Sequence, residues 1–277
     1  MHFCVIFNLF YKNLPRLSVD IDLVYLPLKN RNESLKEISD TLVSIGKQTE
    51  ISISNSKIHY SKITGTEYII KLIVRQNDLT VKVEISPVLR GTVFKSVKKR
   101  ISKMAEQDFG FAEMQIVSFE DLYAGKILAA LDRQHPRDLF DIQSILATGK
   151  ITQKLKQAFL VYLISHNRRM IEILNPRKKD ISKEFTVSFN GMTNLPVKLD
   201  VLLNSRELLI KHINSNLDFS DKQFLLGFVE GNPDWEFFSL KHIKKLPAVK
   251  WKQYNLNQIA INDKKKLISE LRTYLSI

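Results

Sequence analysis

The stretch "RLSVDIDLVY", residues 16–25, places two carboxylates two positions apart in an apolar, β-branched run. The β-branched residues predict a strand over residues 17–26, and the side chains of a strand alternate between its two faces. The apolar side chains therefore share one face, and Asp20 and Asp22 share the other. Two like charges this close repel each other, and a proton, a basic partner or a divalent cation relieves the repulsion.

The D-x-D pair by itself is compatible with two interpretations. Mg²⁺ (or Mn²⁺) takes carboxylate oxygens together with substrate phosphates, so Asp20 and Asp22 are candidate metal ligands. A half-exposed strand carrying two solvated acids is the alternative, because the motif is short.

A third carboxylate lies in "VKVEIS", residues 81–86. Alternation puts Glu84 on the polar face of a short strand, opposite Val83 and Ile85. Three acids on neighbouring strands match the metal site of polymerase-β-type nucleotidyltransferases, in which two metals stabilise the attacking and leaving oxygens. The alternative is an outward-facing acid that pairs with Lys71 or Lys82.

The first part of the chain is expected to mix helix and strand. The pattern predicts a helix over 33–46, closed by Gly46, and strands over 57–63, 67–75 and 79–86. The basic segment "RGTVFKSVKKRISKMAEQ" then has apolar residues at helical spacing. Its cations form either a solvated face or a surface for a polyanion: Lys95, Lys98, Lys99, Arg100 and Lys103.

From residue 118 the pattern is helical almost to the end. Ser118 is a candidate N-cap, and Pro136 and Gly149 are placed to begin and end a helix. Further helices are predicted over 151–166, 197–216, 218–229, 236–245 and 262–275. The change of pattern predicts two domains, 1–117 with mixed α/β structure and 118–277 with helices that close an active-site cleft.

A second group of polar residues lies in "LYAGKILAALDRQHPRDLFDI", residues 122–142. Helical spacing puts Lys126 and Arg133 on one stripe with Tyr123 and Ala130, and it sets Arg137, Asp138 and Asp141 within one turn and a half. Simpler roles remain open for each of these residues. In these alternatives, Asp138 only complements the dipole at a helix N-terminus, Arg137 and Asp141 only form an i, i+4 ion pair, and Lys126 is a surface residue.

These segments, with the late "PAVKWKQYNLNQI", resemble the AbiEii/AbiGii-type toxins, bacterial nucleotidyltransferases paired with an antitoxin in abortive-infection and toxin–antitoxin loci. The resemblance runs from about residue 8 to the C-terminus. It implies an α+β fold, with a nucleotidyltransferase-type mixed sheet flanked by helices and a mainly helical C-terminal domain. Some members of the family add nucleotides to the 3′ end of tRNA.

The resemblance also implies roles for particular residues. Asp20, Asp22 and Glu84 correspond to the metal-binding acids, and Lys126 and Asp141 to active-site residues on the helical side. Arg137 and Asp138 fall in the same motif as these two. The nucleotide-binding set expected on this basis is Arg16, Ser18, Lys126, Arg133, Arg137 and Asp138.

One family feature is not found in its usual place. Family members carry a Gly-Gly-Thr-type segment at a helix start, where backbone amides approach nucleotide phosphates. Counting back from Asp20, that segment falls at Phe3 and Cys4. A chain without these glycines is expected to be a weaker transferase, because phosphoryl-type transfer depends on positioning.

The composition of the 277 residues agrees with a folded, basic protein. A formal net charge of +13 favours a polyanionic partner, which could be nucleic acid, nucleotide or an acidic protein. The single cysteine excludes an intramolecular disulfide, and no stretch is apolar enough to span a membrane, so a cytoplasmic location is expected.

The leading hypothesis is an enzyme that transfers NMP from an NTP to an acceptor such as tRNA, and whose partner protein is an antitoxin. Two rivals remain. The first is a catalytically inactive module that binds nucleotide or antitoxin. The second is a metal-dependent nuclease, because clustered carboxylates also serve phosphodiester cleavage.

Overall fold

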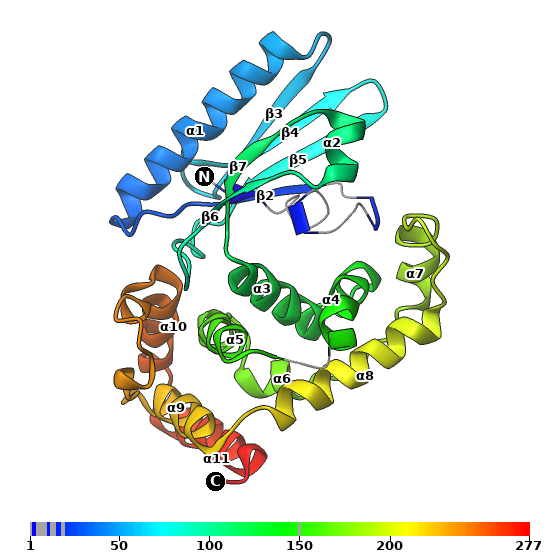
Figure 1. Ribbon diagram of the computed structural model, residues 1–277. Helices are drawn as coiled ribbons and strands as arrows, with labels where there is room; N and C mark the ends of the chain where they lie inside the picture. Colours follow the sequence, from blue (N-terminus) through cyan, green and yellow to red (C-terminus); the bar gives the residue numbers. More distant parts are fainter. Residues whose placement is uncertain (1, 4–9, 12–14, 18–19, 149–150) are drawn as a thin grey trace. The chain divides into compact units, whose positions relative to one another are not determined.

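The computed structural model describes residues 2–3, 10–11, 15–17, 20–148 and 151–277. Its internal contacts divide the chain into two units, Met1–Ser118 and Phe119–Ile277. The first unit contains a mixed sheet, and the second consists of helices (Figure 1). The α+β class predicted from the sequence is confirmed.

The first unit is built on a five-stranded sheet with the order β1-β2-β5-β4-β3. The parallel pair is β2 with β5, and the other neighbours are antiparallel. A separate antiparallel pair is made by β6 and β7. The elements of this unit are β1 (His2–Phe3), β2 (Asp20–Val24), α1 (Arg31–Ser52), β3 (Lys57–Lys62), β4 (Ile69–Gln76), β5 (Leu79–Ile85), β6 (Val97–Arg100), α2 (Lys103–Phe109) and β7 (Glu113–Ile116).

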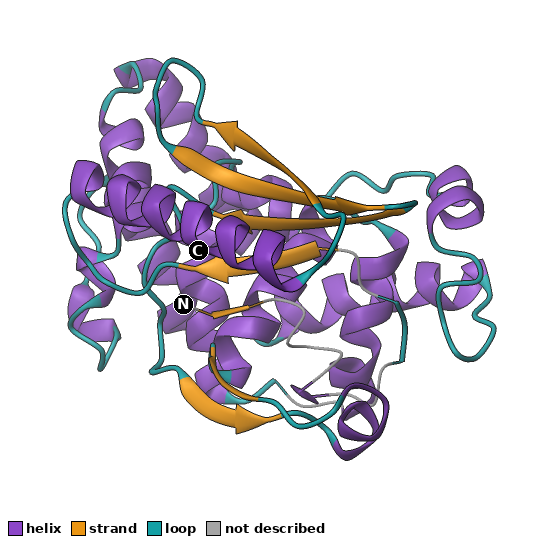
Figure 2. Cartoon of the chain, turned by 90° about the horizontal axis from the view of Figure 1, so that it is seen from above, coloured by secondary structure: helices purple, strands orange, loops and turns teal. Residues whose placement is uncertain are grey.

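The core of the first unit lies between the sheet and α1, which runs lengthwise over the strands when the sheet is seen from above (Figure 2). Leu23, Leu72 and Ile85 are buried against Ile38 and Leu42 of the helix. Burying large aliphatic side chains of this kind stabilises the fold by roughly 1.5–3 kcal/mol each. Because side chains alternate along a strand, the polar residues of β2 and β5 are left on the opposite face.

Helix α1 continues past Gly46, so the expectation that this glycine closes the helix is wrong. The helix begins after Asn30, whose side chain accepts a hydrogen bond from the Glu33 amide, and it ends at Ser52. Gly46 is buried where α1 crosses β3, and a Cβ built on it would overlap the Tyr60 side chain. The glycine therefore permits close packing of helix on strand.

The basic segment that follows β5 is not the helix that its apolar spacing predicted. Residues 97–100 form strand β6, in which Val97 lies opposite Ile116 and Arg100 opposite Glu113 of β7. Ser102 then caps the short helix α2 through the Ala105 amide. The hydrogen bonds to β7 therefore determine a strand here, although the apolar residues of the segment have helical spacing.

The cations of this segment are partly engaged within the unit. Lys98 pairs with Glu113 at 2.5 Å. The Lys99 ammonium lies 3.8 Å from the centre of the Tyr11 ring, and Arg100 lies over Phe111. Burial lowers the pKa of Lys99.

The second unit packs its helices around a core that includes most of α3, with α5 and α4 against it. Its elements are α3 (Phe119–Asp132), α4 (Pro136–Thr148), α5 (Gln153–Ser165), α6 (Met170–Leu174), α7 (Ser182–Ser188), α8 (Leu199–Ser215), α9 (Phe219–Glu230), the 3₁₀ turns η2 (Trp235–Phe237) and η3 (Ile243–Lys245), α10 (Pro247–Asn257) and α11 (Ile261–Leu275).

The helix expected over 236–245 is replaced by η2 and η3. Rings of this region pack on Phe224 of α9. Phe237 stacks on it with ring centres 4.9 Å apart, and Trp235 and Phe238 meet it edge-on. Three nearly consecutive residues thus all direct their rings at Phe224, which a regular helix over this segment would not allow. Throughout the described ranges, every helix is too short or too polar to cross a bilayer.

We predict that Gly46→Ala lowers the stability of the first unit. An exposed helical Gly→Ala change normally stabilises by about 1 kcal/mol, but here the added methyl group would overlap the Tyr60 side chain. In a Tyr60→Ala background that overlap is removed and the tight contact at 3.2 Å to the Ile58 side chain remains, so the same change should be less destabilising than in the wild-type background. Urea unfolding of the four proteins of this double-mutant cycle measures both effects. Stabilisation by Gly46→Ala in the wild-type background would contradict the packing role.

Candidate functional site

The polar face of the sheet carries the three acids found from the sequence. Asp20 and Asp22 lie on β2, and Glu84 lies on β5. In the parallel register Asp22 lies opposite Glu84, and Asp20 lies opposite Lys82. Leu23 and Ile85 point into the core below α1. We call the three carboxylates the acidic face.

Two lysines share this face with the acids. The Lys82 ammonium lies 3.2 Å from the nearer Asp20 oxygen, and the Lys71 ammonium lies 2.8 Å from Glu84, its cross-strand neighbour on β4. All four side chains are partly exposed, so each pair is worth at most about 1 kcal/mol. Of the two pairings left open for Glu84 by the sequence, the structure contains the one with Lys71.

The acidic face fits a divalent cation in the chemistry of its donors. Carboxylates on adjacent strands are the hard oxygen ligands that Mg²⁺ takes. The Oδ1 atom of Asp20 is buried, and the cation beside it is the Lys82 ammonium at 3.2 Å, whose place a bound Mg²⁺ would take. With the side chains as they stand, the part of the chain that the structure describes has no three His, Cys, Asp or Glu side chains grouped to hold a metal.

Residues upstream of β2 are only partly described. Arg16 donates a hydrogen bond to the Leu17 carbonyl at 2.7 Å. Ser18, expected to bind nucleotide, lies outside the described residues, as does Cys4. The backbone of Phe3 lies in β1, antiparallel to Leu23 of β2.

In the second unit, α3 and α4 bring Lys126 and Asp141 together. The Lys126 ammonium donates to Asp141 Oδ2 at 2.5 Å, and the exposed fractions of these side chains are 12% and 2%. Asp141 thus has a buried cationic partner. The polar stripe expected beside Lys126 is wrong in part, because Tyr123 and Ala130 are buried, and the Tyr123 hydroxyl shares a hydrogen bond with Ser144.

The other predicted residues lie around the junction of α3 and α4. Arg133 is exposed and pairs with Asp138 at 2.8 Å, and Asp138 also lies in the first turn of α4. His135 Nδ1 accepts a hydrogen bond from the Arg137 amide, and burial lowers the pKa of this histidine. The imidazole therefore stays neutral at pH 7, so it acts as an acceptor at the start of α4.

Sequence reasoning missed one buried ionic group of the second unit. Lys156 of α5 pairs with Asp218 at 2.7 Å and with Asp221 at 2.6 Å. The two acids form the capping box of α9. The hydrogen bond from Lys156 holds the pKa of Asp218 well below its usual range. The D-x-x-D spacing of Asp218 and Asp221 could have indicated the capping box. Their pairing with Lys156 could not be predicted, because the lysine lies 62 residues before Asp218 in the sequence.

Comparisons with known proteins identify a family from the sequence and a similar fold among solved structures. The sequence profile of a family described as "Nucleotidyl transferase AbiEii toxin, Type IV TA system" matches residues 5–252. Among solved structures, MenT4, a nucleotidyltransferase toxin from Mycobacterium tuberculosis H37Rv, is similar to the chain with a TM-score of 0.56. That similarity covers 98% of this chain and 84% of MenT4 at 12% sequence identity, so it concerns the fold. The search of curated proteins gave no match.

We predict that removing one partner of the buried pair destabilises the second unit. Asp141→Ala is expected to lower the free energy of unfolding by about 3 kcal/mol, because it removes the buried carboxylate that contacts the largely buried Lys126 ammonium. Glu230→Ala breaks the exposed Arg272–Glu230 pair between α11 and α9 and should cost at most about 1 kcal/mol. Denaturant unfolding compares the two variants.

The double variant Lys126→Met/Asp141→Leu completes this test. Apolar residues of similar size often replace a buried ion pair without loss of stability, so this variant should recover most of what Asp141→Ala loses. An Asp141→Ala cost no larger than that of Glu230→Ala would show that the pair is solvated.

Proposed function

The chain belongs to the AbiEii family of nucleotidyltransferase toxins, and from this premise we propose that it transfers NMP from an NTP to an RNA acceptor such as tRNA. The family assignment confirms the enzyme class and the toxin–antitoxin context expected from the sequence. RNA as the acceptor of the nucleotide agrees with the net charge of +13, because cationic surfaces bind the phosphate backbone of nucleic acids.

The observation that carries the proposal is the acidic face. Asp20, Asp22 and Glu84 would hold Mg²⁺ or Mn²⁺, which their shared face and their register on β2 and β5 favour. A bound cation would supply charge stabilisation to the attacking hydroxyl and to the leaving pyrophosphate. In the structure, Lys71 and Lys82 neutralise Glu84 and Asp20. Because these ion pairs are partly exposed they are weak, and a divalent cation would replace the lysines.

The buried pair of the second unit supports a role in nucleotide binding. In this proposal Lys126 donates to a phosphate oxygen, and Asp141 fixes the direction of the ammonium. Orientation of a charged donor by a second buried group reduces the ordering cost of binding. Arg16 and Arg133 would add positive charge toward the triphosphate, and Ser18, Arg137 and Asp138 would complete the nucleotide contacts.

A protein antitoxin is the second partner that we propose. The family description names a type IV toxin–antitoxin system, in which a toxin is encoded with its antitoxin.

The activity is tested by incubating the protein with labelled NTPs, Mg²⁺ and total RNA. Labelled, lengthened RNA is expected. The Lys126→Met/Asp141→Leu variant should fold but lose transfer, and its affinity for NTP should fall by roughly 1–3 kcal/mol because a charge-assisted contact is lost. Glu230→Ala, which breaks the exposed Arg272–Glu230 pair, is the matched control and should transfer label at the wild-type rate.

The two rival functions give different products in the same assay. NTP that binds without any transfer to RNA would identify a non-catalytic module. RNA that becomes shorter would identify a nuclease. Either result would replace the transferase proposal.

Metal binding is tested without reference to activity. Calorimetric titration with Mn²⁺ is expected to show binding to the wild-type protein, and Asp22→Asn should abolish it because one of the few anionic ligands is lost. Asp78→Asn, an exposed acid in the turn between β4 and β5, is the control and should bind as the wild type does. Equal binding by all three proteins would place the metal elsewhere.

A further inference from the structure

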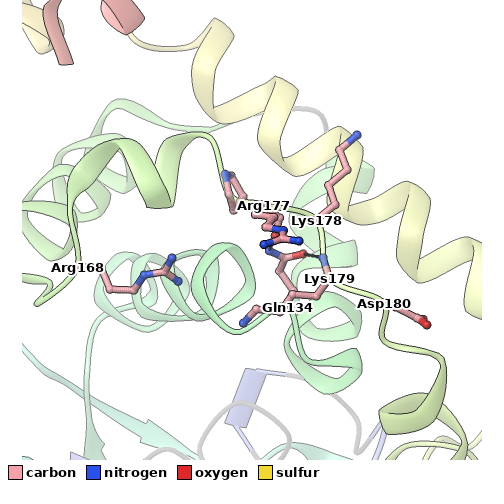
Figure 3. A pocket seen from close by; sticks show the side chains of 7 residues that line it. Gln134, Arg168, Arg177, Lys178, Lys179 and Asp180 are labelled. Atoms are coloured by element: carbon pink, nitrogen blue, oxygen red, sulfur yellow. Dashed lines mark hydrogen bonds between the residues drawn. The ribbon is translucent and has the colours of Figure 1, made fainter. Parts of the chain in front are cut away.

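A basic pocket lies in the second unit, apart from the Lys126–Asp141 pair. It has a volume of about 470 Å³ and is lined by Gln134, Arg168, Pro176, Arg177, Lys178, Lys179 and Asp180 (Figure 3). Four of the seven lining residues are cations, and one is an acid. In Figure 3 Arg168 is directed toward Gln134 and Arg177, whereas Lys178 and Asp180 extend away from them.

The basic segment of this pocket is fixed in place by Gln134. This residue is buried and has a φ of 54°, in the left-handed region. Its amide donates to the Arg177 carbonyl at 2.9 Å and accepts from the Lys179 amide at 3.0 Å. One side chain thus makes both hydrogen bonds that a neighbouring strand would make, which holds residues 177–179 extended.

Two further contacts hold the same segment. Buried Arg206 of α8 donates to the Lys179 carbonyl at 2.7 Å and to the Gln134 side chain at 3.2 Å. The Lys179 ammonium donates to the carbonyls of Asp132 and Arg133 at the end of α3, each at 3.1 Å. A lysine at a helix C-terminus is favourable because it satisfies the last carbonyls. The cations of the pocket therefore project from a rigid backbone.

The charges of the pocket are unequally compensated. Arg168 is neutralised by Asp132 and Glu172, at 2.7 and 3.0 Å. Lys178 pairs with Glu207 at 2.6 Å, but both side chains are exposed, so the pair is weak. Arg177 is exposed and makes no ion pair within the described part of the chain. Arg177 and Lys178 are thus the cations available to a ligand.

The lining favours a backbone phosphate over a nucleotide. Pro176 is the one apolar residue of the lining, and no aromatic ring is present, so the pocket offers no surface on which a base could stack. Contacts from arginine and lysine to phosphate position a strand without reading its sequence. Cations that project from a fixed backbone bind such groups at a lower ordering cost than cations on a mobile loop do.

We infer that this pocket, through Arg177 and Lys178, binds neighbouring backbone phosphates of the RNA acceptor, one at each cation, an inference that rests on the proposed function. The site supplies affinity and register for the RNA and takes no part in binding the NTP.

The test compares two charge reversals in the full chain. Arg177→Glu/Lys178→Glu changes the pocket, and Lys265→Glu/Lys266→Glu makes the same change at exposed residues of α11. Binding of fluorescein-labelled tRNA is followed by anisotropy over a range of salt concentrations, and NTP binding by calorimetry. Arg177→Gln/Lys178→Gln removes the charges without adding repulsion, and circular dichroism with thermal melting checks that each variant is folded.

The pocket reversal should weaken tRNA binding by roughly tenfold or more, and it should flatten the salt dependence by about 1.4 in the log–log slope if two contacts to single-stranded phosphates are lost. The glutamine variant should show a smaller loss in the same direction. The control should bind within a factor of about two or three of the wild type, and NTP affinity should be unchanged throughout.

Equal tRNA affinity of the pocket and control variants would overturn the inference. Loss of NTP affinity with unchanged tRNA affinity would also overturn it and assign the pocket to the nucleotide. If the wild type transfers label to RNA and the pocket variant does so equally well, the pocket assignment alone fails. A wild type that neither binds nor labels RNA would remove the proposed acceptor, and the inference with it.

Discussion

The first unit depends on the parallel pairing of β2 with β5. This one register places Leu23 and Ile85 under α1 and, by alternation, places Asp22 opposite Glu84 on the other face. A shift by one residue would bury the acids and expose the core residues. The packing of α1 therefore enforces the arrangement of the carboxylates, and hydrophobic burial and the candidate metal site are set by the same hydrogen-bonded pair of strands.

Much of the fold followed from local patterns. The D-x-D strand, the β3–β5 meander and most long helices were predicted near their observed bounds, because their periodicity and caps are strong. The errors have non-local causes. Gly46 was assigned to a helix end although it serves a contact with Tyr60, and residues 97–100 pair with a strand that comes later in the chain. The rings around Phe224 likewise replace a regular helix by short turns.

For the candidate site, too, local patterns predicted the placement of residues within an element better than the contacts between elements. Alternation and helical spacing indicated which acids share a face, but the partners of those acids come from other elements. The sequence allowed Glu84 to pair with Lys71 or Lys82, and the structure selects Lys71 of β4. Asp141, for which helical spacing offered Arg137, pairs with Lys126 of α3. The role of Gln134 could not be predicted from its position between two helices, because it depends on a backbone segment some forty residues later. Pairwise charge contacts are decided by tertiary packing, which a single sequence does not display.

The parallel pairing also has a consequence for how the chain folds. Strands β3, β4 and β5 follow one another through short turns, so their meander closes small loops, whereas β2 reaches β5 only after α1 and the hairpin have been placed between them. Contacts that are distant in the chain cost more loop entropy and form later. By this reasoning β2 docks last, and the three carboxylates meet only in the completed sheet. A cation held by them would bind the native state alone and would make unfolding less favourable in proportion to its occupancy.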